Sequence, residues 1–592
     1  MRSAPATNPT IVAKKKKFGL NPQNVHPWQM VLRGGGLQCR YSPSASENQY
    51  PEKPMIAAAA TRVATTAAIG CRGRRGARGE SSTSSSSAKE TPRAHPAPGG
   101  TGPTARPGDA LNDESGSTVH DRENGHGRDV AVLARTPGAE GRRVISAGRS
   151  ASPMRRSGVP RPATRTFTLA NGLNVVLAPS PASPVASVWV WYRVGSKNEH
   201  PGITGASHWV EHMLFQGSPR YGKGEIDRAV VRVGGELNAF TDTDFTAYFT
   251  TVPHEHLAVP LDIESDRMTR ALITDGEVER ERTVIHSERE GNENWPEFRV
   301  EEELYQLAFR IHPYRWDALG RREDIERMSP AQLREYYQRY YGTRNATLVI
   351  AGKFNPAATA AEVRRRFSPL PRSGAPVEVA ETEPFPRGER RAELSGPGTT
   401  PYLQLGWRAP AFSAPETAAT MALDSLLGGE ARLFAAGSMW GRGAEHPSAR
   451  LYRALVDPGL AVRATSDWRP RTYEGLFTIQ AQAARGVSLD RLEAAIDAVL
   501  ERLRRTGPTA AEMDDLRTKV RRGVALAYEG ASRTAFRLGY FSVLGGPALE
   551  DALFRQLLRV RAREIRDRAR AMFVPEARVV VRYEPTEAAG DE

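Results

Sequence analysis

The sequence predicts an α+β protein made of two homologous α/β units that follow a disordered N-terminal segment. Residues 1–160 are rich in Ser, Gly, Pro, Ala and Arg, so they cannot bury enough apolar surface to offset chain entropy. From about residue 165, short apolar runs typical of strands alternate with longer amphipathic runs typical of helices. The order of these runs is similar in two successive stretches of roughly 200 residues, which indicates a duplication.

The first unit is expected at 161–375, and a linker follows it at 376–390, which overlaps a proline-rich run at 369–386. A hairpin is predicted over 167–177, because Asn171 and Gly172 form a tight-turn pair between two apolar runs. Further strands are expected at 185–193, 237–239, 246–252 and 346–352, and helices at 226–233, 256–268, 275–289, 304–309, 330–341 and 357–367.

The second unit is expected at 391–585, with a tail at 586–592. Its strands are predicted at 391–395, 402–407, 476–482 and 577–583. Its helices are predicted at 415–427, from 451, at 489–505, over one long stretch at 509–533, and over most of 549–573.

Charge and cysteine content exclude several classes of protein. Residues 1–160 carry 24 Lys and Arg against 11 Asp and Glu, a net +13 of the chain's +14, so the predicted units are nearly neutral and no nucleic-acid partner is expected. Both cysteines, Cys39 and Cys71, lie in the front segment, so no disulfide framework stabilises the units. No run approaches the length of apolar residues that a membrane span requires.

The N-terminal segment bears on the compartment. No apolar run follows Met1, so we expect no secretory signal and a cytoplasmic protein. Residues 55–70 are weakly apolar and are compatible with a late signal or a transit segment, which would make the protein periplasmic or organellar. A third alternative is a true start near Met55 or Met154.

A metal-binding motif lies at His208, Glu211 and His212. On a helix, spacings of three and four residues place all three side chains on one face. Two imidazoles on one face can bind zinc, and the neighbouring carboxylate can take a proton from a metal-bound water. Gly205 and Ser207 precede the motif and favour a turn and an N-cap, and the apolar residues 213–215 would bury the helix.

A catalytic zinc site needs a third protein ligand, and the predicted helix at 275–290 offers several. Glu281 and Glu288 are seven residues apart and share a face. Composition alone does not choose among the candidates on this segment, which are Glu277, Glu279, Glu281, His286, Glu288 and Glu290.

Four stretches together resemble one enzyme family. They are HWVEHMLFQGS at 208–218, GGELNAFTDTDFTAY at 234–248, ERTVIHSE at 281–288, and His312, Pro313 and Tyr314. They are similar to the pitrilysin/insulinase/mitochondrial processing peptidase family of zinc peptidases, of the bacterial single-subunit type, over about 165–585. The resemblance implies a processing-peptidase-like fold and one Zn²⁺ per chain, with Glu288 as the distal zinc ligand and Glu281 as an additional active-site glutamate.

The resemblance also implies a peptide-binding strand and a partner. Asn238 falls where the family has a substrate-contacting asparagine, beside a sheet edge that receives the peptide as an added strand. The alternative is that Asn238 is a turn residue whose side chain caps its own backbone. Arg450 matches the arginine of an Arg/Tyr pair that holds the substrate carbonyl, but Val462 stands at the tyrosine position. We therefore expect a dimer, either a heterodimer with a non-catalytic paralogue that supplies the pair, or a homodimer in which Tyr452 or Tyr473 fills the gap.

The function implied is a zinc-dependent endopeptidase in which Glu211 is the general base and Glu281 assists. One alternative is a non-catalytic scaffold or assembly subunit, although such relatives usually lose zinc ligands. Another is a binding protein that works through its basic front segment.

Overall fold

A computed structural model describes residues 28–30, 39–41, 162–429 and 446–586. The predicted disorder of residues 1–160 therefore lies outside the described residues, except for a short antiparallel pair formed by β1 (Trp28–Met30) and β2 (Cys39–Tyr41). The predicted tail at 586–592 lies almost wholly outside them as well. No helix in the described part of the chain combines the length and the apolar character needed to cross a membrane.

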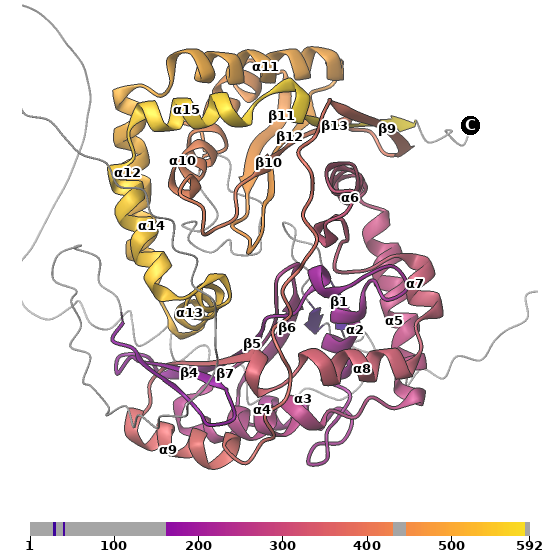
Figure 1. The fold of residues 1–592 in the computed structure, drawn as a ribbon, viewed down its shortest axis with the longest axis vertical. Coiled ribbons are helices and arrows are strands. Elements are labelled where there is room, and N and C mark those ends of the chain that lie inside the picture. Colours follow the sequence, from indigo (N-terminus) through magenta and orange to yellow (C-terminus); the bar gives the residue numbers. More distant parts are fainter. Residues whose placement is uncertain (1–27, 31–38, 42–161, 430–445, 587–592) are drawn as a thin grey trace, which may run out of the picture. The chain divides into compact units, whose positions relative to one another are not determined.

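The first unit contains a six-stranded sheet (Figure 1). Its hairpin forms as predicted, because Gly172 takes a φ of 97° in the turn between the first two strands. From edge to edge the strands are β3 (Arg165–Thr168), β4 (Asn174–Pro179), β8 (Ala346–Gly352), β5 (Val185–Tyr192), β7 (Thr246–Pro253) and β6 (Glu236–Thr241).

Helices of the same unit cover one face of this sheet. Trp209 and Val210 of the helix at 206–213 lie in one buried core cluster with Val188, Val190 and Tyr192 of the central strand β5. The helices are α2 (Ala206–Met213), α3 (Glu225–Arg232), α4 (Ala258–Arg270), α5 (Asp275–Glu293), α7 (Arg322–Arg327), α8 (Pro330–Tyr340) and α9 (Pro356–Phe367). The unit also contains α6 (Pro296–Ala308), which packs on the second sheet instead.

The second unit repeats the sheet. Its order is β9 (Arg390–Pro397), β13 (Val579–Thr586), β10 (Tyr402–Ala409), β12 (Gly475–Ala483) and β11 (Ala461–Trp468). This order matches β4-β8-β5-β7-β6, and in both sheets the first of these pairs is parallel and the rest are antiparallel. The predicted α+β class and internal duplication are confirmed.

Strand β11 was not predicted. It lies at the sheet edge and its register shifts between Ala461 and Arg463, so a bulge interrupts the alternation by which a strand is recognised.

The helices of the second unit correct one prediction. A single helix over 509–533 is wrong, because the chain ends one helix at Leu526 and turns at Gly530, whose φ is 81°. The helices are α10 (Thr417–Leu427), the π-helical turn η6 (Tyr452–Val456), α11 (Leu489–Thr506), α12 (Ala510–Leu526), α13 (Ala531–Leu544), α14 (Pro547–Arg559) and α15 (Ala562–Met572).

Each sheet is also covered by a helix from the other unit. Helix α13 packs Phe536 against Trp189 and Trp191 of β5, and a Cβ atom on Gly539 would lie 1.9 Å from the Trp191 Nε1. Helix α6 packs Leu304 against the second sheet. The first sheet ends in two edge strands, β3 and β6, and the outer edge of each pairs with no other strand of the described residues, although β2 lies near β6.

Candidate metal centre

Helix α2 is held at its start by Glu199. The helix begins after Gly205, which has a φ of 91°, and a Cβ atom there would lie 2.8 Å from the Leu319 carbonyl oxygen. The two carboxylate oxygens of Glu199 accept hydrogen bonds from the backbone N–H groups of Gly205 (2.7 Å) and Ser207 (2.8 Å). Ser207, expected near the cap, lies inside the helix, and its hydroxyl pairs with the Tyr336 hydroxyl instead.

Replacing Glu199 with Gln is expected to lower the free energy of unfolding by ~1–3 kcal/mol, because the amide cannot accept at both oxygen positions and leaves a buried N–H unpaired.

Burial raises the pKa of Glu199 to about 7, so the wild type should lose stability as the pH rises from about 5 to 8. The Glu199→Gln protein has no carboxyl group to titrate at this position. The difference in free energy of unfolding between the wild type and this variant should therefore become smaller as the pH rises over that range. Urea unfolding at both pH values measures this, with exposed Glu335→Gln as the control.

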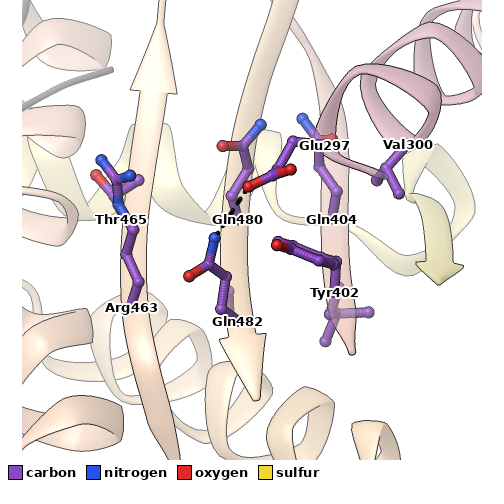
Figure 2. A pocket seen from close by; sticks show the side chains of 10 residues that line it. Glu297, Val300, Tyr402, Gln404, Arg463, Thr465, Gln480 and Gln482 are labelled. Carbon is purple, nitrogen blue, oxygen red and sulfur yellow. Dashed lines mark hydrogen bonds between the residues drawn. The ribbon is translucent and has the colours of Figure 1, made fainter. Parts of the chain in front are cut away.

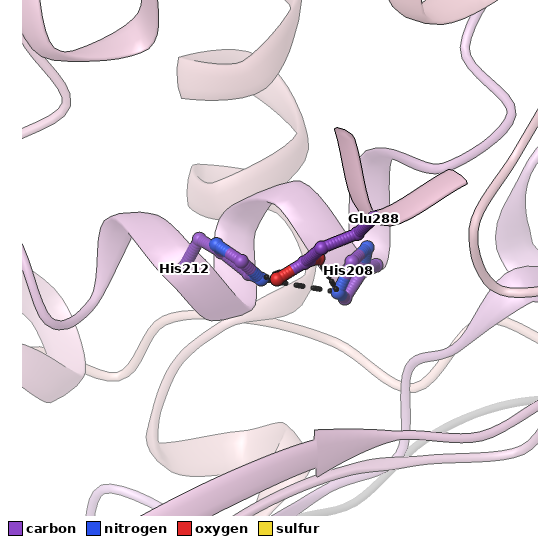
Figure 3. A group of neighbouring side chains, drawn as sticks. All are labelled: His208, His212 and Glu288. Carbon is purple, nitrogen blue, oxygen red and sulfur yellow. Dashed lines mark hydrogen bonds and ion pairs between the residues drawn. The ribbon is translucent and has the colours of Figure 1, made fainter. Parts of the chain in front are cut away.

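Three buried side chains converge on one point (Figure 3). The Nε2 atoms of His208 and His212 lie 3.1 Å apart, and Oε2 of Glu288 lies 3.6 Å and 3.4 Å from them. One donor atom from each residue lies within 4.8 Å of the others. Sequence spacing placed the two histidines together; the packing of α5 on α2 brings Glu288 to them.

The chemistry of this group fits a divalent cation. Both carboxylate oxygens of Glu288 are buried without a hydrogen-bond partner, which is costly unless a cation balances them. Burial raises the pKa of Glu288 to about 7, while burial and then the nearby His212 lower the pKa of His208 well below its usual range. Neutral imidazoles and one carboxylate are the donors that zinc takes in catalytic sites, so these residues are suited to hold it.

Glu281 reaches the site through His212. Its Oε2 lies 3.1 Å from the His212 Nδ1, and its Oε1 accepts a hydrogen bond from the Gln216 side chain at 2.7 Å. A carboxylate on Nδ1 fixes the tautomer and the ring orientation, so that Nε2 faces the metal position. The geometry therefore favours a positioning role for Glu281; Gln216 was missed, and no local sequence signal marks it.

Glu211 lies on the same buried face of α2 as the histidines. The hydroxyl of Thr241, the last residue of β6, donates to its Oε2 at 2.6 Å. Thr241 was also missed in the sequence, although it ends the GGELNAFT stretch that carries the family resemblance.

The two residues expected to bind substrate are both present, in different surroundings. Asn238 lies on the edge strand β6, and its Oδ1 accepts a hydrogen bond from the Ala239 backbone. Arg450 donates from Nε and Nη2 to Glu512, each at 2.8 Å, and from Nη2 to the Gly507 carbonyl at 3.0 Å. Their roles toward a substrate stay predictions, and for Arg450 such a role requires it to exchange these partners.

Val462 occupies the position at which the family resemblance predicts the tyrosine of the Arg/Tyr pair. Val462 lies at the bulge of edge strand β11 and is 62% exposed. Tyr473 has its hydroxyl engaged, since it donates to Glu378 at 2.6 Å and accepts from the Val379 N–H at 2.9 Å.

A small cavity of about 20 Å³ lies elsewhere, between α6 and the second sheet (Figure 2). Strand register places two rows of side chains on this face. Gln482 donates to Glu297 at 3.2 Å across it. The cavity contains none of the predicted site residues. Its rows are Tyr402, Gln482 and Arg463, and Gln404, Gln480 and Thr465.

Comparison with known proteins supports a peptidase. The family model described as Insulinase (Peptidase family M16) matches residues 174–320, which hold all three metal donors and Glu211. The model described as Peptidase M16 inactive domain matches residues 327–520, which hold none of them.

Individual relatives agree with these matches. Zinc protease PqqE of Helicobacter pylori is 30% identical over 363 residues, or 60% of this chain and 78% of that protein. The mitochondrial-processing peptidase subunit beta of Lentinula edodes is 26% identical over 397 residues, covering 66% of this chain and 83% of that one. A crystal structure of a protease from Helicobacter pylori superposes with a TM-score of 0.67 at 26% identity, covering 72% of this chain and 100% of that chain.

Proposed function

Because the chain belongs to the insulinase family of peptidases, peptidase family M16, we propose that it is a zinc-dependent endopeptidase acting on peptides or extended polypeptide segments. The observation that carries the proposal is the buried group of His208, His212 and Glu288, with Glu211 on the same helix. A non-catalytic assembly subunit does not require an intact donor set of this kind, and the match to an inactive domain, at residues 327–520, contains neither the donors nor Glu211.

The residues divide the chemistry among them. His208, His212 and Glu288 would hold one zinc ion, which when bound lowers the pKa of a water molecule toward ~7 and polarises a carbonyl. Glu211 takes the proton of the attacking water and hands it to the leaving amine nitrogen. Glu281 keeps the His212 ring turned toward the metal position.

The substrate would bind along β6. This strand ends the first sheet, so its outer edge offers backbone N–H and C=O groups to an extended peptide. Backbone pairing holds a peptide without reading its sequence, and Asn238 on the same strand is the side chain we propose to contact it. The expected substrate class is therefore extended or unfolded chain, without a strict cleavage motif.

The proposal is tested by cleavage of quenched fluorescent peptides by the purified chain. We expect cleavage with zinc bound, loss of cleavage after chelation and recovery on adding zinc back. A chain that carries one zinc and yet cleaves neither peptides nor unfolded proteins, alone or with its paralogue, contradicts the proposal.

We also propose a dimer, in which a paralogue supplies an Arg/Tyr pair across the site. Val462 stands where the tyrosine is expected, and Arg450 is bonded to Glu512. A donor to the developing oxyanion contributes about 2.7–4 kcal/mol, so the lone chain should cleave ~100-fold or more below the rate of the mixture with its paralogue. Cleavage assays of the lone chain, shown homogeneous by light scattering, and of the mixture measure this. Equal rates would contradict the division of labour and favour a self-sufficient homodimer.

A further inference from the structure

We propose that Thr241 is a positioning residue that fixes the carboxylate of Glu211 through its hydroxyl. The inference rests on the proposed function, in which Glu211 is the general base. The Thr241 Oγ1 lies 2.6 Å from the Glu211 Oε2, both side chains are buried, and the two residues come from different elements, β6 and α2.

Neighbouring hydroxyl groups determine where the Thr241 proton goes. Strand register pairs Thr241 with Thr246 of β7, and their Oγ1 atoms lie 3.3 Å apart. The Thr246 hydroxyl donates its single proton to the Val194 carbonyl at 2.9 Å, so toward Thr241 it can only accept. The short contact of Thr241 is with a carboxylate, which when ionised only accepts. The Thr241 proton therefore lies on the bond to Glu211.

This bond restrains a flexible base. A glutamate side chain rotates about three bonds, whereas a β-branched threonine in a strand is stiff at χ1 and Thr241 is only 1% exposed. A short hydrogen bond from a hydroxyl on this stiff side chain restrains the Glu211 Oε2 atom, and with it the carboxylate. Proton transfer requires the base within hydrogen-bond reach of the attacking water, so a carboxylate that turns away lowers the rate without weakening peptide binding.

The test compares variants that differ only in this hydroxyl. Thr241→Val keeps the shape of the side chain, and we expect kcat to fall ~10–100-fold with KM within about twofold and zinc content unchanged. Thr241→Ser should restore kcat to within a few fold of wild type. Thr250→Val is the matched control, because Thr250 is equally buried on β7 and its hydroxyl has no hydrogen-bond partner; it should leave kcat unchanged.

Two further measurements decide the remaining outcomes. If Thr241→Val does not fold, Thr241→Ser and Thr241→Ala both lack the methyl group, and equal kcat values for these two overturn the proposal. A crystal structure of the zinc-loaded Thr241→Val protein shows the position of the Glu211 carboxylate and needs no assay of activity. We expect the carboxylate to leave its wild-type position, and an unmoved carboxylate overturns the proposal. A wild-type chain that binds zinc but never cleaves peptide refutes the endopeptidase function instead, and this crystal structure still tests the bond.

Discussion

Replacing Glu211 with Gln is expected to lower peptide cleavage at least ~100-fold while one zinc ion stays bound to each chain. The amide keeps the shape of the side chain and can still accept the Thr241 hydroxyl, but it cannot take a proton from water. Because Glu211 is not one of the three donors, zinc occupancy should not change. Cleavage rates and zinc content, measured on the same preparation, check both parts.

The matched control for this variant is Glu335→Gln, which makes the same change at an exposed position of α8. It should leave both rate and zinc content unaltered. Near-normal turnover by the Glu211→Gln protein with zinc present would show that another group is the base.

Loss of a zinc ligand should abolish both metal retention and cleavage. We expect His208→Ala and Glu288→Gln to lose most of the zinc from the purified protein, since each removes one of only three protein donors. Glu290→Gln changes an exposed residue of the same helix and is the control. Stoichiometric zinc in the Glu288→Gln protein would assign the third ligand elsewhere, with Glu281 the first residue to examine.

The pH dependence of zinc binding tests the same site. Zinc would bind the carboxylate form of Glu288, and burial raises the pKa of that group to about 7. Protons therefore compete with the metal, and the apparent affinity should fall by about tenfold for each pH unit below 7 on account of Glu288. The slope for Glu288→Gln should be smaller by this one proton. Competition with a chelator between pH 5.5 and 8 measures both slopes.

Contacts close in the chain were predictable from the sequence. The spacing of His208, Glu211 and His212 fixes three side chains on one helical face whatever surrounds the helix. Asn171 and Gly172 specify their turn through local backbone preferences. Strand β8 forms over the same residues, 346–352, that its apolar run predicts. For the helix face and the turn, the deciding interactions join residues a few positions apart. For β8 the local apolar run marks the strand, although its hydrogen bonds go to β4 and β5.

Edges and breaks were harder to predict. The edge strand β11 was not predicted because its bulge interrupts the alternation of apolar and polar residues. Strand formation there depends on pairing with β12 and not on the local pattern. The break between α12 and α13 was missed because residues 509–533 are helix-forming nearly throughout. Helix α13 packs on the first sheet, where Gly539 lies close to Trp191, about 350 residues away in the chain, and a contact at that separation leaves no local signal.

The sequence alone therefore determined the class of fold, its duplication, and the helix face that carries His208, Glu211 and His212. Only the tertiary structure placed Glu288 beside the histidines, Glu281 on the His212 ring and the Thr241 hydroxyl on Glu211. The physical reason is that each of these contacts joins separate elements, α2 with α5 or α2 with β6. Hydrogen bonds and burial between distant segments leave no periodic trace in the sequence, because any polar side chain that packing brings to the right distance can make them.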